Sequence, residues 1–219
     1  MKNVVLIGAS GYVGTAILNE LLNRGHKVTA IVRDPAKIKA GNHNLKIVKA
    51  DIEDAGTIID ICKDKDAVIS AYNPGWSNPE IYEDTLRVYN ELLDDIKKSG
   101  VKRLLIVGGA GTLFVKPGVR LVDTELIPEA ILPGVKSLGK FYLDTLMNEK
   151  DIDWVFFSPA ANLGNRKAGK RTGKFRLGKD DMIVDKDGES FISVEDYAMA
   201  MVDELEQENH HKERFTIGY

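Results

Sequence analysis

The chain has 219 residues, of which 43% are apolar and 29% charged, and its formal net charge is −3. These values are typical of a globular protein with a sizeable core, and they exclude a disordered chain. The near balance of charge gives no sign of a nucleic-acid or membrane partner. No apolar run approaches the length of a membrane span and no signal peptide precedes the first strand, so we expect a cytoplasmic protein.

Strand-like and helix-like segments alternate along the first 160 residues. In chain order the hydrophobic pattern predicts strand Asn3–Ile7, helix Tyr12–Arg24, strand Lys27–Val32, a short helix opened by Asp34 and Pro35, strand Leu45–Lys49, helix Asp54–Cys62, strand Ala67–Ser70, helix Glu80–Ser99, strand Arg103–Val107, helix Lys136–Lys150 and strand Trp154–Phe157. Strands separated by helices require right-handed crossovers, so the prediction is an α/β protein with a doubly wound parallel sheet.

The pattern changes after Pro159. A stretch rich in glycine and in basic side chains, Arg166–Lys179, is followed by short hairpin-like strands. Ser193 then caps a helix that reaches Gln207, and Arg214–Gly218 is expected to be a last strand. We predict one domain over residues 1–219, in which residues 160–219 form a small C-terminal cap over the edge of the sheet.

Three glycines stand between the first strand and the first helix. They recur every third residue within the segment Gly8, Ala9, Ser10, Gly11, Tyr12, Val13 and Gly14. A helix N-terminus offers unpaired N–H groups and a partial positive charge, and glycines let a backbone approach a diphosphate closely. The segment therefore predicts a dinucleotide-binding loop. The alternative is a plain tight turn, which does not require the third glycine.

The end of the second strand bears on the choice of cofactor. It carries Arg33, whose planar guanidinium suits the 2′-phosphate of NADP(H), whereas an NAD(H) site usually has an acidic residue here. Asp34 is better placed to cap the next short helix. We therefore expect NADP(H) to be preferred over NAD(H). The alternative for Arg33 is an exposed charge at a strand end.

The residues that follow the other strand ends are further candidates, because ligands of a doubly wound sheet bind beyond the carboxyl ends of its strands. They are Asp51, Ile52, Ala71, Tyr72, Gly108, Gly109, Ser158, Pro159 and Ala160. Asp51 is a candidate acceptor for the adenine amino group, with Ile52 over the ring, or else a cap for the next helix. The later residues are expected beside the pyrophosphate, the nicotinamide ribose and the carboxamide in turn.

Several segments together resemble the atypical short-chain dehydrogenase/reductases with an NAD(P)H-binding domain, and within them the group called NADH-flavin reductases, which is related to biliverdin reductase B. The segments are Ile7–Gly14, Ile31–Pro35, Val68–Ala71, Val101–Gly111, Pro117–Asp123, Arg171–Arg176 and Ile192–Ala198. The segments with Gly108 and Pro117 are more specific to this group than the glycine loop. The resemblance implies an NAD(P)-binding Rossmann fold.

The resemblance does not carry over a catalytic pair. Typical members use Tyr-x-x-x-Lys on the helix after the fifth strand, but here Lys136 stands in the tyrosine place, with Lys140 in the lysine place. Tyr142 has no lysine four residues later. The catalytic residues are therefore unknown, and an ordinary alcohol dehydrogenase, which needs that proton transfer, is disfavoured.

Direct hydride transfer to a flavin-like or quinone-like acceptor needs less from the protein. Tyr72, Trp76 and Phe114 could stack such an acceptor, or could serve ordinary loop packing. The stretch Arg166–Lys179 could attract an anionic flavin phosphate, or could be a solvated loop. The alternatives to a reductase are a non-catalytic redox sensor and an epimerase or dehydratase. The partner is expected to be a small-molecule acceptor, and the oligomeric state stays open.

The cysteine and the histidines give little support for a metal site or for thiol chemistry. The single cysteine, Cys62, falls on the apolar face of a predicted helix and is expected to be buried. The four histidines, His26, His43, His210 and His211, have no metal-ligand spacing. We therefore expect no disulfide framework and no metal.

Overall fold

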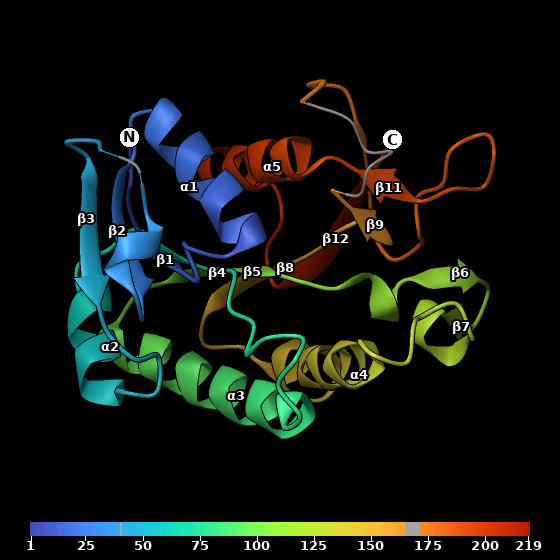
Figure 1. Cartoon of the computed structure of the whole chain (residues 1–219), viewed down its shortest axis with the longest axis horizontal. Coiled ribbons are helices and arrows are strands. Elements are labelled where there is room, and N and C mark those ends of the chain that lie inside the picture. Colours follow the sequence, from blue (N-terminus) through green and yellow to red (C-terminus); the bar gives the residue numbers. More distant parts are fainter. Residues whose placement is uncertain (40, 165–170) are drawn as a thin grey trace.

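An eight-stranded sheet runs through the centre of the protein (Figure 1). The computed structural model describes residues 1–39, 41–164 and 171–219. The strand order is β10-β12-β8-β5-β4-β1-β2-β3, and every neighbouring pair is parallel except β10 with β12. The strands are β1 (Asn3–Ile7), β2 (Lys27–Val32), β3 (Leu45–Lys49), β4 (Ala67–Ser70), β5 (Arg103–Val107), β8 (Asp153–Ser158), β10 (Arg176–Gly178) and β12 (Glu213–Gly218). The predicted doubly wound parallel sheet is confirmed.

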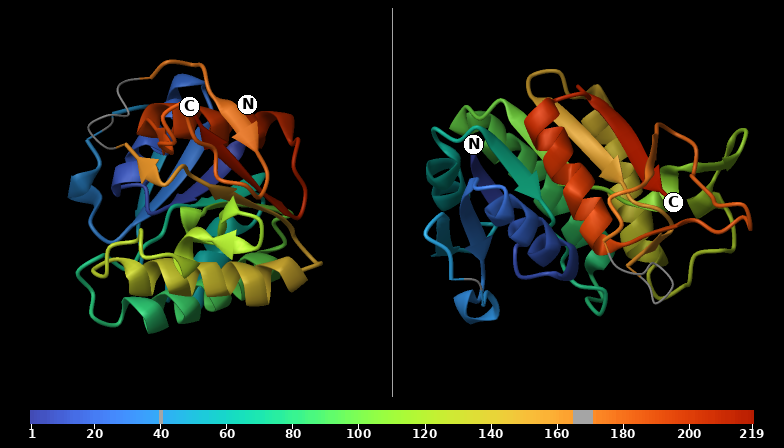
Figure 2. Two further views of the ribbon diagram at one scale, coloured as in Figure 1. Left: turned by 90° about the vertical axis from the view of Figure 1, so that its right-hand side faces the viewer. Right: turned by 90° about the horizontal axis from the view of Figure 1, so that it is seen from above.

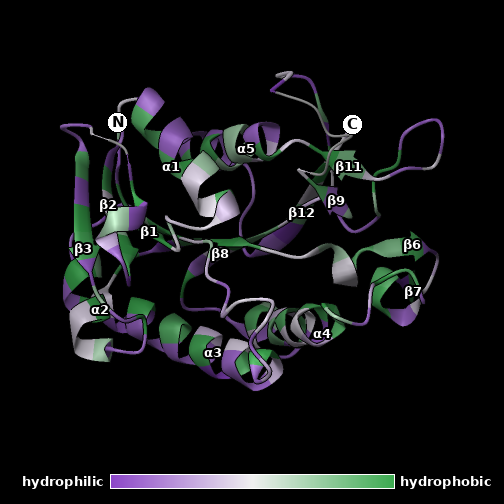
Figure 3. Cartoon of the chain, in the orientation of Figure 1, coloured by the Kyte–Doolittle hydropathy of each residue, from purple (hydrophilic) through white to green (hydrophobic). Residues whose placement is uncertain are grey.

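Helices cover both faces of the sheet (Figure 1). One face carries α1 (Tyr12–Asn23) and α5 (Val194–Gln207), and the other carries α2 (Ala55–Cys62), α3 (Ile81–Ser99) and α4 (Leu132–Lys140). Successive side chains of β1 enter opposite cores: Val4 and Leu6 pack with α1 and α5, and Val5 and Ile7 pack with α2 and α3. This alternation explains why the strands are continuous apolar runs in the sequence. Figure 3 shows hydrophobic residues along β8 and a mixed pattern along α3.

Short elements gather at one end of the molecule (Figure 2). They include the hairpin of β6 (Phe114–Lys116) and β7 (Val119–Arg120), and the parallel pair of β9 (Asn162–Leu163) and β11 (Phe191–Ile192). Short 3₁₀ turns cover Pro35–Lys37, Ala110–Thr112, Leu121–Asp123 and Leu146–Asn148. No helix among the described residues is long and apolar enough to cross a membrane.

The C-terminal segment does more than cap the sheet. Strand β12 lies inside the sheet, parallel to β8, and α5 packs on α1. The expected hairpin after Pro159 is wrong, since β9 pairs in parallel with β11 and β10 pairs with β12. These partners lie far apart along the chain, so local turn signals could not indicate them. Strands from both ends of the chain therefore share one sheet.

The predicted helix Lys136–Lys150 is wrong at both ends. Helix α4 begins at Leu132, with Pro133 in its first turn, and ends at Lys140. A π turn over Phe141–Thr145 follows, and both of its first two aromatic rings are buried. Phe141 lies 5.0 Å from the Tyr89 ring, and Tyr142 stacks on Phe156 at 4.6 Å. Burial of two consecutive aromatic side chains accounts for the break in the regular helix.

Several local predictions are confirmed. The Asp34 carboxylate accepts a hydrogen bond from the Ala36 N–H at 3.1 Å, and the Ser193 hydroxyl accepts one from the Asp196 N–H at 3.0 Å, so both residues cap the helices that follow them. Cys62 is fully buried, and burial raises the pKa of its thiol to about 12. Such a thiol is a core residue rather than a nucleophile.

Candidate functional site

The strand order reverses at β1, which lies between β2 and β4. The carboxyl ends of β1 and β4 therefore flank the position where doubly wound sheets bind their ligands. Gly8 follows β1 and Ala71 follows β4. The Ala71 N–H donates to the Ile7 carbonyl at 2.9 Å, and a Cβ atom on Gly8 would lie 2.5 Å from the Ala71 carbonyl oxygen. Gly8 also has a φ of +77°, so only glycine fits this close approach.

The contacts at Gly14 bear on whether the segment Gly8–Gly14 is a plain turn or a dinucleotide-binding loop. A Cβ atom on Gly14 would lie 2.0 Å from the Gly8 carbonyl oxygen, so the third glycine lets α1 start directly on the loop. Gly11 precedes α1, and no side chain caps the helix there. Among the residues that the structure describes, no side chain accepts from the N–H groups of the first turn, which is the arrangement that a bound phosphate uses. The geometry of residues Gly8–Gly14 supports the predicted dinucleotide loop over the plain turn.

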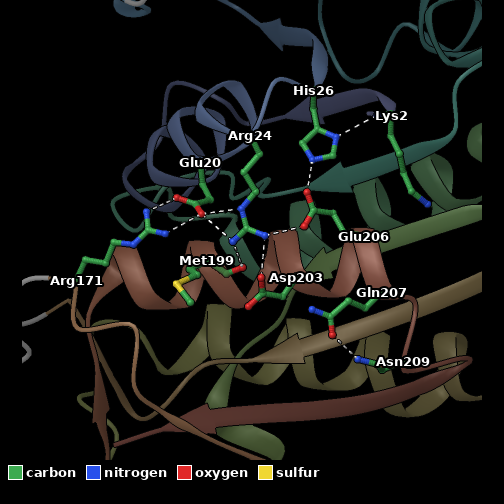
Figure 4. A network of polar contacts seen from close by, with 10 residues as sticks. All are labelled: Lys2, Glu20, Arg24, His26, Arg171, Met199, Asp203, Glu206, Gln207 and Asn209. Atoms are coloured by element: carbon green, nitrogen blue, oxygen red, sulfur yellow. Dashed lines mark hydrogen bonds and ion pairs between the residues drawn. The ribbon is translucent and has the colours of Figure 1, made fainter.

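A network of ion pairs holds α1 against α5 (Figure 4). The Arg24 guanidinium donates to Asp203 at 2.7 Å and to Glu206 at 2.8 Å, both on α5. It also donates to Glu20 at 2.8 Å, one turn earlier on α1. Glu20 accepts a second guanidinium, that of Arg171, at 2.5 Å. The network fixes the position of α1, and therefore of the N–H groups at its start.

The end of β2 carries an unpaired cation. Arg33 is exposed and forms no ion pair with any residue that the structure describes. Arg87, on α3, is occupied by contrast: its guanidinium donates to Glu53 at 2.8 Å and to Asp84 at 3.0 Å. No local pattern indicates the bridge from Arg87 to Glu53, because these residues are 34 positions apart along the chain. Arg33 is thus available for an anion at the adenosine end of the predicted cofactor path.

Asp51 is not the helix cap that was one of its two predicted roles. Its carboxylate accepts the Glu53 N–H at 3.1 Å in a tight turn, whereas Asp54 caps α2 by accepting the Thr57 N–H at 3.2 Å. The cap interpretation is therefore wrong, because α2 begins at Ala55 and Asp54 is the residue directly before it. Asp51 is exposed and Ile52 is half-buried beside it. Their contact with adenine stays a prediction.

Tyr72 follows β4 and lies near charged side chains of neighbouring elements. The charged groups that influence its hydroxyl are Asp84, Glu53, Arg33 and Arg87. Burial, helped by Asp84 and Glu53, raises the pKa of Tyr72 to about 12. The buried Tyr89 hydroxyl donates to the Tyr72 carbonyl at 3.0 Å and so fixes this strand end. Tyr89 lies on the buried face of a predicted helix. A buried tyrosine hydroxyl needs a hydrogen-bond partner, and this need could have indicated its contact with the main chain.

Hydrogen bonds hold the ends of β5 and β8 closely together. The Gly108 N–H donates to the Phe157 carbonyl at 2.9 Å, and the Gly109 carbonyl accepts the Ser158 hydroxyl at 2.9 Å. A Cβ atom on Gly108 would lie 2.6 Å from the Phe156 ring. Residues 158 to 160 are buried, so the Ser158 hydroxyl serves the main chain here. The contact of Ser158, Pro159 and Ala160 with a carboxamide stays a prediction. For Ser158 the contact would involve its main-chain groups, because its hydroxyl donates to the Gly109 carbonyl.

Helix α4 presents no tyrosine–lysine pair. Lys136 is exposed, and the ammonium of Lys140 is paired with Asp144 one turn later. Tyr142 is buried, and the Arg214 guanidinium lies 5.0 Å from its ring centroid. Burial raises the pKa of Tyr142. The sequence lacks the Tyr-x-x-x-Lys pattern, and α4 contains no tyrosine at another position that could take its place beside Lys140.

A cavity of about 460 Å³ lies beside the glycine loop. Its lining residues are Ser10, Gly11, Tyr12, Thr15, Ala16, Asn19, Glu20, Asn23, Arg171, Val194 and Glu195. The Tyr12 hydroxyl donates to the Gly164 carbonyl at 3.1 Å and so links the loop to the C-terminal segment. Among the described residues, no group of three or more His, Cys, Asp or Glu side chains is arranged to hold a metal ion.

The basic stretch is only partly described. Arg166, Lys167 and Lys170 lie outside the described residues. Three of the described cations are held by the protein itself: Arg171 pairs with Glu20, Lys179 pairs with Glu213 at 2.6 Å, and Arg176 donates to the Val184 carbonyl at 2.6 Å. These contacts favour a structural role for Arg171, Arg176 and Lys179 over the attraction of an anionic substrate.

Comparisons with known proteins agree with this geometry. A family model described as NAD(P)H-binding matches residues 8–208. YwnB of Bacillus subtilis (strain 168) is 42% identical over 214 residues, which cover 97% of this chain and 96% of YwnB. A solved structure from Bacteroides thetaiotaomicron, described as a "putative epimerase", is 60% identical with a TM-score of 0.93 and covers 100% of this chain and 97% of its own.

A second solved structure, from Streptococcus pneumoniae TIGR4, is described as a "putative NADH-flavin reductase". It is 35% identical to this chain with a TM-score of 0.85, and the match covers 100% of this chain and 99% of the other. The resemblance predicted from the sequence is thus confirmed. Since the family model spans most of the chain and starts at the first glycine of the loop, the chain belongs to the NAD(P)H-binding family.

Proposed function

We propose that the protein is an NADPH-dependent oxidoreductase that passes a hydride directly to a flavin-like or quinone-like acceptor. One observation carries this proposal: α4, the helix after β5, presents no tyrosine–lysine pair. Lys136 is exposed, the Lys140 ammonium is paired with Asp144, and Tyr142 is buried. A tyrosine that serves as acid and base must reach the reacting groups.

The absence of such a tyrosine limits the chemistry. When bound, NADPH supplies a hydride, and a conjugated acceptor can take its proton from water. The chain then has to hold the dinucleotide at Gly8–Gly14 and Arg33, and to position the acceptor. An epimerase, by contrast, needs a proton transfer at a sugar carbon or hydroxyl. This difference favours the description of the Streptococcus relative over that of the Bacteroides relative as the model for this chain.

The preference for NADPH is the first testable part of the proposal. Arg33→Ala is expected to raise the Kd for NADPH about tenfold to a hundredfold and to leave the Kd for NADH nearly unchanged, because only the 2′-phosphate loses charge-assisted hydrogen bonds. Titration of the reduced cofactors by fluorescence measures both constants. Lys27→Ala, at the opposite end of the same strand, is the matched control for loss of one positive charge. Equal affinity of the wild type for both cofactors would contradict the preference.

Turnover tests the reaction itself. Oxidation of NADPH is expected to proceed with FMN, riboflavin or a simple quinone, and deuterium at C4 of the nicotinamide is expected to slow it about twofold or more if hydride transfer is rate-limiting. The absorbance of NADPH measures the rate. Absence of turnover with all three classes of acceptor would overturn the proposed reductase.

A non-catalytic redox sensor is the second candidate, and the same lack of an acid–base tyrosine favours it. It predicts that oxidised and reduced cofactor bind with measurable affinity and that no acceptor is turned over. The small-molecule acceptor, the lack of nucleic-acid and membrane partners and the cytoplasmic location remain predictions of the sequence.

A further inference from the structure

We propose that Trp76 is the side chain on which the acceptor stacks, and that the acceptor is accordingly a planar aromatic molecule such as an isoalloxazine or a fused-ring quinone. The inference deepens the proposed function and rests on it. It begins with an unusual exposure: 53% of Trp76 is accessible, while the other tryptophan, Trp154, is 2% accessible and donates its Nε1–H to the Glu149 carbonyl at 3.2 Å.

The loop that carries Trp76 is fixed by hydrogen bonds. The Asn73 side chain accepts the Gly75 N–H at 2.7 Å, and the Gly75 carbonyl accepts the Asn78 N–H at 3.0 Å. The Asn78 amide then donates to Asp84 at 2.8 Å, which ties the loop to α3. Gly75 has a φ of +114°, a conformation that side chains rarely allow. The loop therefore holds the indole in a preset place, which lowers the entropic cost of stacking a ligand on it.

Trp76 lies against the first turn of α4. A Cβ atom on Gly134 would be 2.9 Å from the Trp76 ring, so the lack of a side chain at this position makes room for the indole edge. The same turn packs on the segment after β5, since a Cβ atom on Gly111 would lie 2.3 Å from a Val135 methyl group. Figure 1 shows the loop from β4 passing in front of the sheet to α3, beside α4. Trp76 therefore stands near the ends of β4 and β5, at the nicotinamide end of the predicted cofactor path.

The two other candidate aromatic residues are committed elsewhere. Tyr72 is half-buried, meets the Tyr89 ring edge-on at 5.8 Å and lies near several charged side chains, among them Asp84 and Arg87. Phe114 lies in the β6–β7 hairpin, where its main chain bonds to residues 180 and 182 and its ring lies 5.9 Å from the Arg120 guanidinium. Trp76 is the remaining one of these three candidates, and tryptophan offers the largest face for stacking.

Intrinsic fluorescence tests the assignment without turnover. Riboflavin is titrated into the protein loaded with NADP⁺, which cannot reduce it. Emission is excited where tryptophan is the only side chain that absorbs, and it is corrected for the absorbance of riboflavin. We expect saturable, static quenching in the wild type and its loss in Trp76→Phe, because buried Trp154 is then the only emitter. Quenching that does not saturate, or that survives unchanged in Trp76→Phe, would overturn the inference.

Steady-state kinetics give the second readout. Trp76→Ala is expected to raise the KM for riboflavin roughly tenfold to a hundredfold, the range of an aromatic stacking contact, and Trp76→Phe to restore most of it. The Kd for NADPH and the Tm are expected to stay as in the wild type. The control is Met147→Ala, which removes a comparably exposed apolar side chain from the 3₁₀ turn Leu146–Asn148.

A failure of the proposed reductase and a failure of the Trp76 assignment give different results. Saturable quenching that depends on Trp76, without turnover of any acceptor, would overturn the reductase and uphold the stacking assignment. Turnover with the same KM in the wild type and in Trp76→Ala would uphold the reductase and overturn the role of Trp76.

Discussion

Gly14→Ala is expected to abolish dinucleotide binding, whereas Gly56→Ala, the same change in another helix, is expected to leave binding intact. The added methyl at position 14 would lie 2.0 Å from the Gly8 carbonyl oxygen and 2.8 Å from its carbon. Both atoms belong to the main chain of Gly8, which cannot move away from the new methyl group as the end of a flexible side chain could. Gly8 itself is confined by Ala71, so the loop has no free direction in which to move.

Two effects are expected from this clash. Overpacking costs about 1–3 kcal/mol of unfolding free energy. The Kd for NADPH is expected to rise more than about a hundredfold, because the first-turn N–H groups of α1 lose their alignment with the phosphates and several charge-assisted hydrogen bonds weaken together. In Gly56→Ala the nearest atom to the new methyl is an Asp54 oxygen at 3.8 Å, an ordinary contact. Alanine in a helix then adds about 0.5–1 kcal/mol of stability.

Calorimetric titration with NADPH and thermal unfolding of both variants measure these effects. The comparison separates the clash at the loop from the general consequence of placing alanine in a helix. A Gly14→Ala protein that binds NADPH with wild-type affinity would refute the assignment of the glycine loop.

Features that depend on neighbours in the chain could be predicted from the sequence. The strands and helices through Val107, the glycine loop, and the caps at Asp34 and Ser193 all follow from local spacing and local hydrogen bonding. Even here, position within a turn mattered. Asp51 and Asp54 are both plausible caps by residue type, and only the three-dimensional start of α2 shows that Asp54 has the role.

Features that depend on distant partners could not be predicted. The bridge from Arg87 to Glu53 joins residues 34 positions apart, and the hydroxyl of Ser158 finds its acceptor 49 positions away. The place of β12 inside the sheet likewise depends on pairing with β8. The same limit applies to Tyr72 and Trp76, which the sequence presents as equivalent aromatic residues of one loop. In the structure Tyr72 is half-buried against Tyr89, whereas Trp76 is exposed beside the first turn of α4.

Asp196→Asn is expected to destabilise the fold by about 3 kcal/mol, the cost of leaving buried donors without a full set of acceptors. Asp196 is fully buried near the start of α5. Its carboxylate accepts the N–H groups of Thr172 and Gly173 at 2.9 Å, the Thr172 hydroxyl at 2.6 Å and the Tyr219 hydroxyl at 2.5 Å. It thus fastens the segment after Arg171 and the C-terminal residue to α5. An amide in its place turns one acceptor into a donor that faces other donors.

The cost of Asp196→Asn should depend on pH. Burial acts to raise the pKa of Asp196, but the hydrogen bonds from Thr172, Tyr219 and Gly173 outweigh it and hold the pKa below its ordinary value. A carboxyl whose pKa is lowered by folding contributes its stability in full above the unfolded pKa of about 3.9 and loses it as the pH falls through the folded pKa. The stability gap between wild type and variant is therefore expected to be constant near pH 7 and to close below about pH 4.

Chemical denaturation at several pH values measures this gap, and thermal unfolding at pH 7 measures the Tm. At pH 7 the Tm of Asp196→Asn is expected to lie roughly 10 °C below that of the wild type, since ~1 kcal/mol moves the Tm of a chain of this size by about 2–4 °C. Glu195→Gln is the control, because it removes a carboxylate from the same helix turn at an exposed position. If the gap stays constant from pH 7 to pH 3, the ionised Asp196 carboxylate does not supply the stability, and the fastening of the C-terminal segment must rest on other contacts.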